Sequence, residues 1–250
     1  IKTDKPYVTF NHEGVDKKIN CDFVAGCDGY HGISRQNIPK DKINVSERLY
    51  PFGWLGILSK TPPVDSELIY ANHERGFALA SMRNKNLSRY YIQTPIEDKV
   101  CEWNDKKFWL ELKKRLPHEA SEKLITGPSI EKSIAPLRSF VAEPMKYGSM
   151  FLVGDAAHIV PPTGAKGLNL AFSDVYYLHQ ALKNYYNNND KTAINLYSIK
   201  ALRRVWKTIR FSWWMTKTLH KFPNQSQFDQ KIQEAEIEYL ENSVSAQRSL

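Results

Sequence analysis

The sequence predicts a globular protein of mixed α/β (α+β) class. Two short apolar runs, residues 21–29 and 151–155, end in Asp-Gly and Gly-Asp, which is typical of buried strands that stop at a turn. A strand-rich stretch over 44–100 lies between them, and helical periodicity fills the last third of the chain. With 250 residues, of which 42% are hydrophobic, the chain can form one large or two small packed domains.

The first half of the chain alternates between strand signals and turn residues. Weak alternation over 1–19 predicts a hairpin that turns at Asn11–Gly14, and Ser34–Pro39 closes the turn after the first apolar run. Further on, the spacing of Phe108, Leu112 and Leu116 predicts a helix over 104–116, which Pro117 ends. Four short β-favouring runs precede this helix, with a hairpin tip at 84–86: Tyr50–Leu58, Leu68–Asn72, Gly76–Met82 and Arg89–Thr94.

The C-terminal part is predicted to be helical from about Leu168, with a polar break at 187–189 and a last helix over 225–240. Residues 192–220 have the clearest amphipathic period. We expect its core-facing stripe to consist of Ile199, Leu202, Trp206, Ile209, Trp213 and Thr216. The other face is basic and carries Lys200, Arg203, Arg204, Lys207 and Arg210.

The overall charge and the cysteines restrict partners and compartment. A net charge of +8 favours anionic partners, which include nucleic acid, an acidic membrane and small anionic ligands. No apolar run has the length of a membrane-spanning helix. Three cysteines (Cys21, Cys27 and Cys101) without CxxC spacing, and the lack of a signal sequence, predict a reducing, cytoplasmic location.

The most informative segment runs from Gly154 to Asn169. Asp155 follows a predicted buried strand, where a carboxylate can accept hydrogen bonds from ligand hydroxyls. The glycines of the next loop allow the backbone to approach a ligand closely. A helix that starts near Gly167 directs free N–H groups and a positive dipole end toward that ligand. The pattern therefore predicts a site for an anion or for a ring that becomes anionic.

This segment resembles a known family. Gly154–His158 followed by Pro162–Asn169 is similar to the second flavin-binding motif of the single-component aromatic hydroxylases, and Asp28-Gly29 within 26–35 resembles their Asp-Gly motif. The resemblance implies an incomplete FAD-binding three-layer domain with an inserted mixed-sheet substrate domain and C-terminal helices. It places the FAD-binding domain at 1–43 and 138–170, the substrate-binding sheet at 44–137 and the helices at 171–250.

One departure from the family is large. No two glycines lie two positions apart, so the GxGxxG motif for the ADP part of FAD is missing from the 250 residues. The chain also begins with Ile1 rather than Met. We therefore expect a fragment that lacks the N-terminal GxGxxG segment and the C-terminal tail.

The activity follows from the resemblance. The stretches 50–56, 67–77, 133–140 and 211–215 narrow it to hydroxylases that convert 4-hydroxybenzoate to 3,4-dihydroxybenzoate with FAD, NADPH and O2 through a flavin C4a-hydroperoxide. It implies a homodimer at full length, and neither nucleic acid nor a membrane nor a metal as partner.

Candidate substrate residues lie on the predicted hairpin. Ser81 and Arg83 are two apart in a strand, so their side chains are expected to share a face, and Tyr91 is expected on the strand opposite. Arg83 supplies a planar fork that can grip a carboxylate. The resemblance assigns all three to the substrate carboxylate, Tyr70 to the substrate phenol and the Pro162 carbonyl to the reacting edge of the ring.

The resemblance also assigns the cofactor residues. FAD would contact Asp28, Gly29, Asp155, Gly167, Leu168 and Asn169, and NADPH would contact His31, Arg138 and Arg35. For Arg35 a solvated surface charge is an equal alternative. His158 has no metal-ligand spacing to a partner and is expected to be structural.

Two other functions stay open at this point. The basic face of residues 200–221 suits a protein that binds nucleic acid or a membrane surface, although no known nucleic-acid-binding motif accompanies it. A chain without its GxGxxG segment is also expected to be inactive as a fragment. A flavin absorption spectrum distinguishes these cases.

Overall fold

A computed structural model describes residues 6–249, so the first five residues of the predicted segment 1–43 and Leu250 lie outside it. The described chain divides into two compact units. Unit 1 contains the residues up to Arg48 together with Arg138–Trp213, and unit 2 contains Leu49–Leu137 and Trp214–Leu250. The helices predicted over 171–250 are therefore shared between both units and do not form a part of their own.

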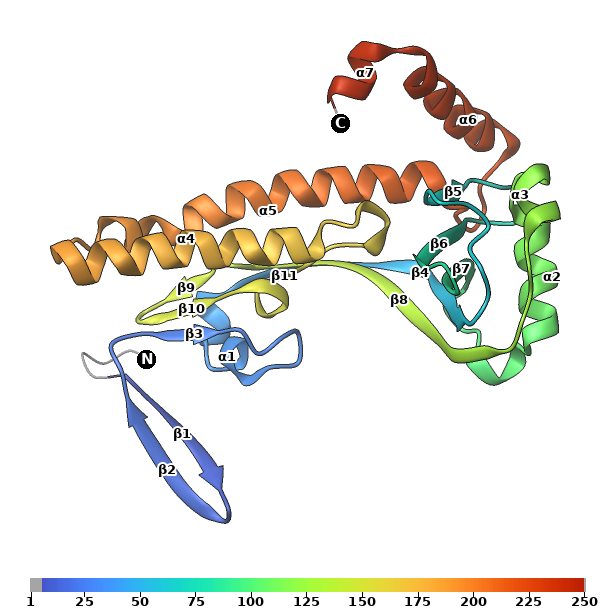
Figure 1. The fold of residues 1–250 in the computed structure, drawn as a ribbon. Helices are drawn as coiled ribbons and strands as arrows, with labels where there is room; N and C mark the ends of the chain where they lie inside the picture. The colour runs from blue at the N-terminus through green and yellow to red at the C-terminus, as the bar shows by residue number, and fades with distance from the viewer. Residues whose placement is uncertain (1–5, 250) are drawn as a thin grey trace. The chain divides into compact units, whose positions relative to one another are not determined.

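Unit 1 holds two small sheets. Strands β1 (Tyr7–His12) and β2 (Val15–Asn20) form the predicted hairpin, which is exposed along its whole length and projects from the unit in Figure 1. Strand β3 (Val24–Gly26) pairs in parallel with β10 (Met150–Leu152), and β9 (Lys146–Tyr147) pairs antiparallel with β10. The two predicted buried strands are thus neighbours, and their carboxyl ends lie at one edge.

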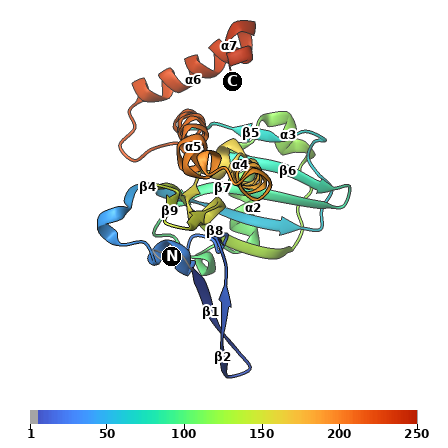
Figure 2. The same cartoon turned by 90° about the vertical axis from the view of Figure 1, so that its left-hand side faces the viewer.

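The helices of unit 1 cover this sheet. Helix α4 (Gly167–Asn188) ends at Asn189 in a left-handed conformation, and α5 (Thr192–Leu219) begins three residues later. Up to Trp213, α5 runs alongside α4 (Figures 1 and 2). The short elements are α1 (Ile33–Gln36), β11 (His158–Ile159) and the 3-10 turns Lys40–Lys42, Gly154–Ala156 and Pro162–Gly164.

The buried stripe of α5 differs from the predicted one. Ile199 is 59% exposed and Trp206 is 41% exposed. Ile209 and Thr216 are buried as predicted, and the other buried apolar positions are Ile194, Tyr197, Ala201 and Val205. The helix has apolar residues on two faces, and the face with the small residues Ala201 and Val205 packs into the core because it allows the closer approach. The basic residues are exposed, as predicted.

Unit 2 is built on an antiparallel arrangement of long strands. Its strands lie in the order β8-β4-β7-β6-β5, and one face packs against α2 through Phe108 and Leu112. The strands are β4 (Asn44–Ser59), β5 (Ile69–Ala71), β6 (Ala78–Asn84), β7 (Leu87–Pro95) and β8 (Ser129–Glu143). The pairs β4–β7, β6–β7 and β5–β6 are antiparallel. Strands β4 and β8 continue along the chain into unit 1, where β8 pairs with β11.

The helices of unit 2 come from two places in the chain. Helix α2 (Asp105–Arg115) follows the 3-10 turn Val100–Glu102 and begins at the capping residue Asn104, as the sequence predicts within one residue. Helix α3 (His118–Lys123) follows Pro117. The C-terminal α6 (Gln227–Asn242) starts with a capping box between Ser226 and Asp229, and α7 (Val244–Ser249) ends the described chain.

Candidate functional site

The Gly-Asp loop of unit 1 follows β10. Gly154 has φ +62°, a left-handed conformation that glycine adopts without strain. The next residue, Asp155, is exposed, and its carboxylate has no hydrogen-bond or ion-pair partner within residues 6–249. A free carboxylate at the carboxyl end of a parallel strand is well suited to accept hydrogen bonds from ligand hydroxyls.

The N-terminus of α4 also has the features that a flavin requires. No side chain caps it, and its first turn contains no acidic residue, so the first backbone N–H groups are available to an anionic ligand. Leu168 is 70% exposed and Phe172 is 63% exposed, which provides apolar surface beside these donors. Gly167, Leu168 and Asn169 form this first turn, so the residues present fit an apolar ring that becomes anionic.

Pro162 lies in the 3-10 turn before α4. Its carbonyl oxygen accepts a hydrogen bond from the Ala165 N–H at 2.9 Å, and a carbonyl oxygen retains a second lone pair for a ligand. A Cβ on Gly164 would lie 2.8 Å from the Ser212 hydroxyl, so this turn packs tightly onto α5. The loop therefore has a fixed shape.

In the Asp-Gly loop, the carboxylate of Asp28 has a structural role. Asp28 accepts a hydrogen bond from the Ser34 backbone N–H at 2.8 Å and so caps α1. Partial burial opposes ionisation of Asp28, but this bond and others from the same turn lower its pKa overall. Gly29 has φ +75° with open space around it, and a Cβ on Gly32 would lie 2.1 Å from the Asp28 carboxyl carbon. Both glycines are thus required by the turn itself.

Arg35 connects the two predicted motifs. Its guanidinium donates to the Tyr30 carbonyl at 2.6 Å and to the Ala156 carbonyl at 2.8 Å, and it stacks on the rings of Tyr30 and Phe140. This half-buried, bonded guanidinium is not the solvated surface charge of the alternative, and the contact with NADPH stays a prediction. Arg35 links the Asp-Gly loop to the Gly-Asp loop 121 residues later in the chain.

The other two predicted NADPH residues flank Tyr30. The exposed His31 ring packs edge-on against Tyr30 with the centroids 4.9 Å apart. The Arg138 guanidinium lies over the Tyr30 ring, 4.6 Å from its centroid, and is paired with Glu47 at 3.2 Å. The structure thus brings His31 and Arg138 together around one aromatic ring of unit 1.

The predicted substrate residues of unit 2 lie mostly on one face of its sheet. Gly56, Tyr91, Leu79 and Tyr70 are directly opposite one another on four successive strands, and Ser81 lies on the same face opposite Arg89. A Cβ on Gly56 would lie 2.5 Å from the Tyr91 ring, so this glycine makes room for the tyrosine. Tyr70, Ser81 and Tyr91 therefore lie on one face of the sheet.

Arg83 departs from the predicted alternation. The register between β6 and β7 shifts between Met82 and Asn84, so Arg83 is the extra residue of a β-bulge. Its side chain is exposed and has no hydrogen-bond or ion-pair partner among the described residues. Arg89, by contrast, is held by both oxygens of Glu131 at 3.0 and 3.1 Å. On this hairpin Arg83 is thus the guanidinium that remains available to a carboxylate.

An aromatic layer that the sequence does not reveal covers the same face. The rings of Tyr70, Phe77, Trp54 and Tyr91 follow one another with centroids 5.0–5.6 Å apart. His220, after α5, stacks on Phe77 and accepts a hydrogen bond from the Trp54 indole at 2.7 Å. Burial lowers the pKa of His220 to about 3 and raises the pKa of Tyr70, so both side chains are neutral near pH 7.

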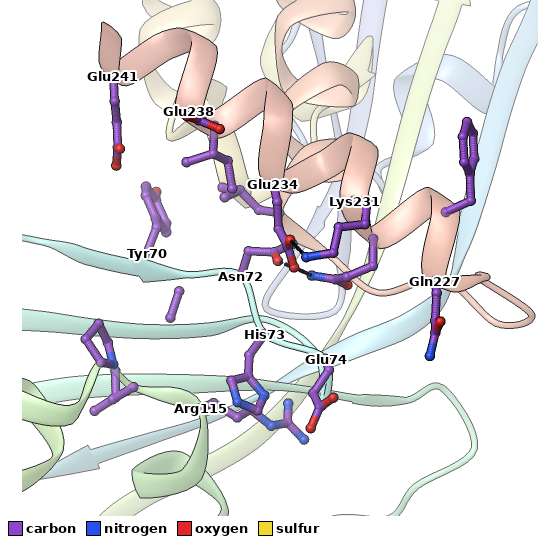
Figure 3. Close-up of a pocket in the computed structure, with 17 residues that line it drawn as sticks. Tyr70, Asn72, His73, Glu74, Arg115, Gln227, Lys231, Glu234, Glu238 and Glu241 are labelled. Atoms are coloured by element: carbon purple, nitrogen blue, oxygen red, sulfur yellow. Dashed lines mark hydrogen bonds and ion pairs between the residues drawn. The ribbon is translucent and has the colours of Figure 1, made fainter.

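Unit 2 also contains a cavity of about 1010 Å³ between β5 and α6. Figure 3 shows Tyr70 and Asn72 on the strand side and Glu234, Glu238 and Glu241 on the helix side. Ser81, Arg83 and Tyr91 do not line this cavity. The lining also contains Lys231 and Arg115, but glutamates outnumber these cations, which disfavours an anionic ligand and does not match the chemistry of the predicted carboxylate site.

Comparison with known proteins identifies the family. The FAD binding domain family matches residues 2–212, which include both motif loops and most of the sheet. The chain belongs to this family. A curated relative, the p-hydroxybenzoate hydroxylase of Acinetobacter baylyi, is 60% identical over 245 residues, which are 98% of this chain and 61% of the relative. The chain thus spans about three fifths of that relative's length.

More distant relatives share the fold. The kynurenine 3-monooxygenase of Yarrowia lipolytica is 25% identical over 197 residues, covering 72% of this chain and 42% of the relative. The solved p-nitrophenol 4-monooxygenase of Pseudomonas putida superposes with a TM-score of 0.73 at 16% identity, covering 99% of this chain and 62% of that one. Aklavinone-11 hydroxylase, solved with FAD and aklavinone, gives 0.71 at 13% identity, over 86% and 41% of the two chains.

Proposed function

We propose that this chain is part of an FAD-dependent monooxygenase that hydroxylates 4-hydroxybenzoate to 3,4-dihydroxybenzoate with NADPH and O2. The observation that carries the proposal is the 60% identity to a p-hydroxybenzoate hydroxylase across nearly the whole chain. The aromatic face of unit 2, and on the same hairpin Arg83 with no partner among the described residues, support a substrate that is an aromatic carboxylate.

The cofactor roles fall to unit 1. Asp155 accepts hydrogen bonds from FAD hydroxyls, and the N–H groups at Gly167, Leu168 and Asn169 stabilise negative charge on the flavin ring. When bound, reduced flavin supplies the activation of O2. Asp28 and Gly29 shape the neighbouring loop, and the exposed His31 and the half-buried Arg138 bind the phosphates of NADPH. Arg35 contributes by holding the two loops together.

The substrate roles fall mainly to unit 2. Arg83 binds the carboxylate, with Ser81 and Tyr91 as hydroxyl donors on the same hairpin. Tyr70, kept neutral by the burial that raises its pKa, donates a hydrogen bond to the phenol oxygen and so favours the phenolate, the form that pushes charge to the ortho carbon. In unit 1, the Pro162 carbonyl orients the reacting edge of the ring.

The test uses the full-length protein. We expect a flavin absorption spectrum after purification, and NADPH oxidation that rises on addition of 4-hydroxybenzoate with formation of 3,4-dihydroxybenzoate. 4-Hydroxybenzamide has the same ring and no negative charge, and it should stimulate oxidation poorly. Equal turnover of both compounds, or the absence of bound flavin, contradicts the proposal.

Assembly and location are part of the same proposal. We propose a homodimer at full length, which a sedimentation experiment measures directly. The exposed Trp206 and the nearby half-buried Trp213 on α5 supply apolar surface for such a contact. All three cysteines are free thiols, which favours a reducing, cytoplasmic compartment. Within residues 6–249, no helix is long and apolar enough to cross a bilayer.

A further inference from the structure

Unit 1 contains a buried histidine–aspartate pair directly behind the Gly-Asp loop. His158 and Asp174 are 2% and 1% exposed, and the His158 Nε2 lies 2.6 Å from the Asp174 Oδ2. The same carboxylate oxygen accepts the Gly154 N–H at 3.0 Å. Asp174 is on the second turn of α4, whereas Gly154 and His158 are the two ends of the loop that carries Asp155.

Burial of the Asp174 carboxylate is energetically unfavourable. Its second oxygen, Oδ1, is buried without a hydrogen-bond partner among the described residues. A buried carboxylate with an unused oxygen is costly, and a well-packed apolar pair of similar volume commonly gives equal or higher stability. The pair provides a geometric constraint that an apolar pair cannot, because one oxygen bonds both ends of a five-residue loop.

That constraint acts on the backbone around Asp155. The Gly154 N–H is fixed by Asp174 while Gly154 adopts φ +62°, and its missing side chain lets the loop approach Ala171 on α4, where a Cβ would be 3.3 Å from the Ala171 Cβ. On the other side of Asp155, Arg35 holds the Ala156 carbonyl at 2.8 Å. Asp155 has no partner among the described residues, so the backbone on either side sets the direction in which its side chain leaves the loop.

We propose that Asp174, together with His158, is the positioning residue of the flavin site: it fixes the Gly154 N–H and thereby aims the Asp155 carboxylate at the FAD hydroxyls. This inference rests on the proposed function, because it assigns Asp155 to FAD. Asp174 does not touch the cofactor. It acts through the loop, so its effect on FAD affinity depends on the presence of the Asp155 carboxylate.

A double-mutant cycle on the full-length protein tests this dependence. FAD dissociation constants are measured by fluorescence titration of apoprotein for Asp155→Ala, Asp174→Ala and the double variant. We expect each single change to weaken FAD binding about tenfold, roughly the loss of one hydrogen bond to a charged group. The double variant should bind FAD about as weakly as Asp155→Ala alone, because there is no longer a carboxylate to aim.

A general loss of stability gives a different result. If the two changes multiply to about a hundredfold in the double variant, Asp174 acts independently of Asp155 and the inference is wrong. If Asp155→Ala itself leaves FAD affinity unchanged, the proposed flavin site fails instead, so the two failures are distinguishable. Tyr197→Phe is the matched control: it removes a buried hydrogen bond to the Leu152 carbonyl of 2.8 Å in the same unit, and it should lower the urea midpoint without changing FAD affinity.

A conservative variant covers the case in which Asp174→Ala does not fold. Asp174→Asn keeps the shape and, with its amide oxygen in the place of Oδ2, keeps an acceptor for the Gly154 N–H and for the Nε2–H of a neutral His158. We expect Asp174→Asn to bind FAD within about threefold of the wild type, a difference of less than one hydrogen bond. FAD binding by Asp174→Asn that is weakened tenfold or more would show that charge, not positioning, is what matters here.

Discussion

The two units hold their candidate ligand-binding residues in different ways. In unit 1 the loops are fixed by internal hydrogen bonds: Asp28 caps α1, Arg35 bonds carbonyls in both loops, and Asp174 bonds both ends of the Gly-Asp loop. In unit 2 the candidate residues stand on regular strands and are held by packing. Tyr91 lies over Gly56, and Arg83 has no internal partner among the described residues.

This difference predicts different responses to mutation. A change in the loops of unit 1 alters a network, so its effect spreads to neighbours and is non-additive. In unit 2, a change of an exposed candidate residue such as Arg83 removes a contact that exists only when the ligand is present, so it alters binding with little effect on folding. The predictions below test this contrast, beginning with the largest expected effect.

Arg83 should give the largest effect on substrate. Arg83→Ala leaves a bound carboxylate without its partner, which costs about 2–5 kcal/mol and weakens 4-hydroxybenzoate binding at least tenfold. Arg83→Lys keeps the charge without the planar fork and should fall in between. Substrate titration of the full-length protein, followed by flavin absorbance, measures both variants.

The control for Arg83 is another exposed cation on the same hairpin. Lys85→Ala removes a positive charge two residues away at the tip and should leave substrate binding unchanged. The urea midpoint of Arg83→Ala should equal that of the wild type. If Arg83→Ala binds 4-hydroxybenzoate normally, the carboxylate assignment is wrong.

Gly56 tests how packing holds Tyr91. In Gly56→Ala the new methyl group would lie 2.5 Å from a carbon of the Tyr91 ring, so the ring must move. We expect a loss of about 1–3 kcal/mol of stability, typical of overpacking, together with weaker substrate binding. FAD affinity serves as the internal control and should not change, since Gly56 belongs to unit 2. A Gly56→Ala protein with normal stability would argue against the packing account.

The buried His220 should make the stability of unit 2 sensitive to acid. Burial holds its pKa at about 3 in the folded state, below the value of 6.5 in an unfolded chain. The unfolded state therefore binds the proton first, and stability falls as the pH drops below about 6.5, by at most roughly 1.4 kcal/mol per pH unit. Urea unfolding of the wild type and His220→Phe between pH 7 and pH 4.5 measures this.

Comparison with His220→Phe isolates the contribution of His220 to the pH dependence, because the carboxylates titrate in both proteins. The stability of His220→Phe should be lower at pH 7, because the Trp54 indole loses its acceptor, but it should fall less on acidification. Parallel pH profiles for the two proteins would contradict the neutral, buried state of His220.

Asp28 should give the smallest effect. Asp28→Ala removes the cap of α1 and should cost about 1 kcal/mol, whereas Asp28→Asn keeps the acceptor and should cost only a few tenths. Chemical denaturation measures both. If Asp28→Asn preserves stability but weakens FAD or NADPH binding, Asp28 contacts a cofactor as well as capping the helix.

Much of the fold follows from local patterns in the sequence. The hairpin at the N-terminus, the strands around Tyr91 and the helix at 105–115 are all predicted within a few residues, because turn residues and periodicity act over short distances. The motif at 154–169 is likewise local. The long strand β8 is not predicted, since its 15 residues lack a clean alternation and it is formed by pairing with distant strands.

The sequence by itself determined the family resemblance, the strand-loop-helix character of the motif segments and the two strands that carry Ser81 and Tyr91. Only the tertiary structure decided the link from Arg35 to Ala156, the pairing of Asp174 with Gly154, the stacking of His220 on Phe77 and the bulge at Arg83. The features determined by the sequence depend on residues close together in the chain. Of the features that only the structure decided, the three contacts join residues 20 to 143 positions apart, and the bulge depends on how two strands align. A local sequence pattern contains no information about such contacts or about strand alignment.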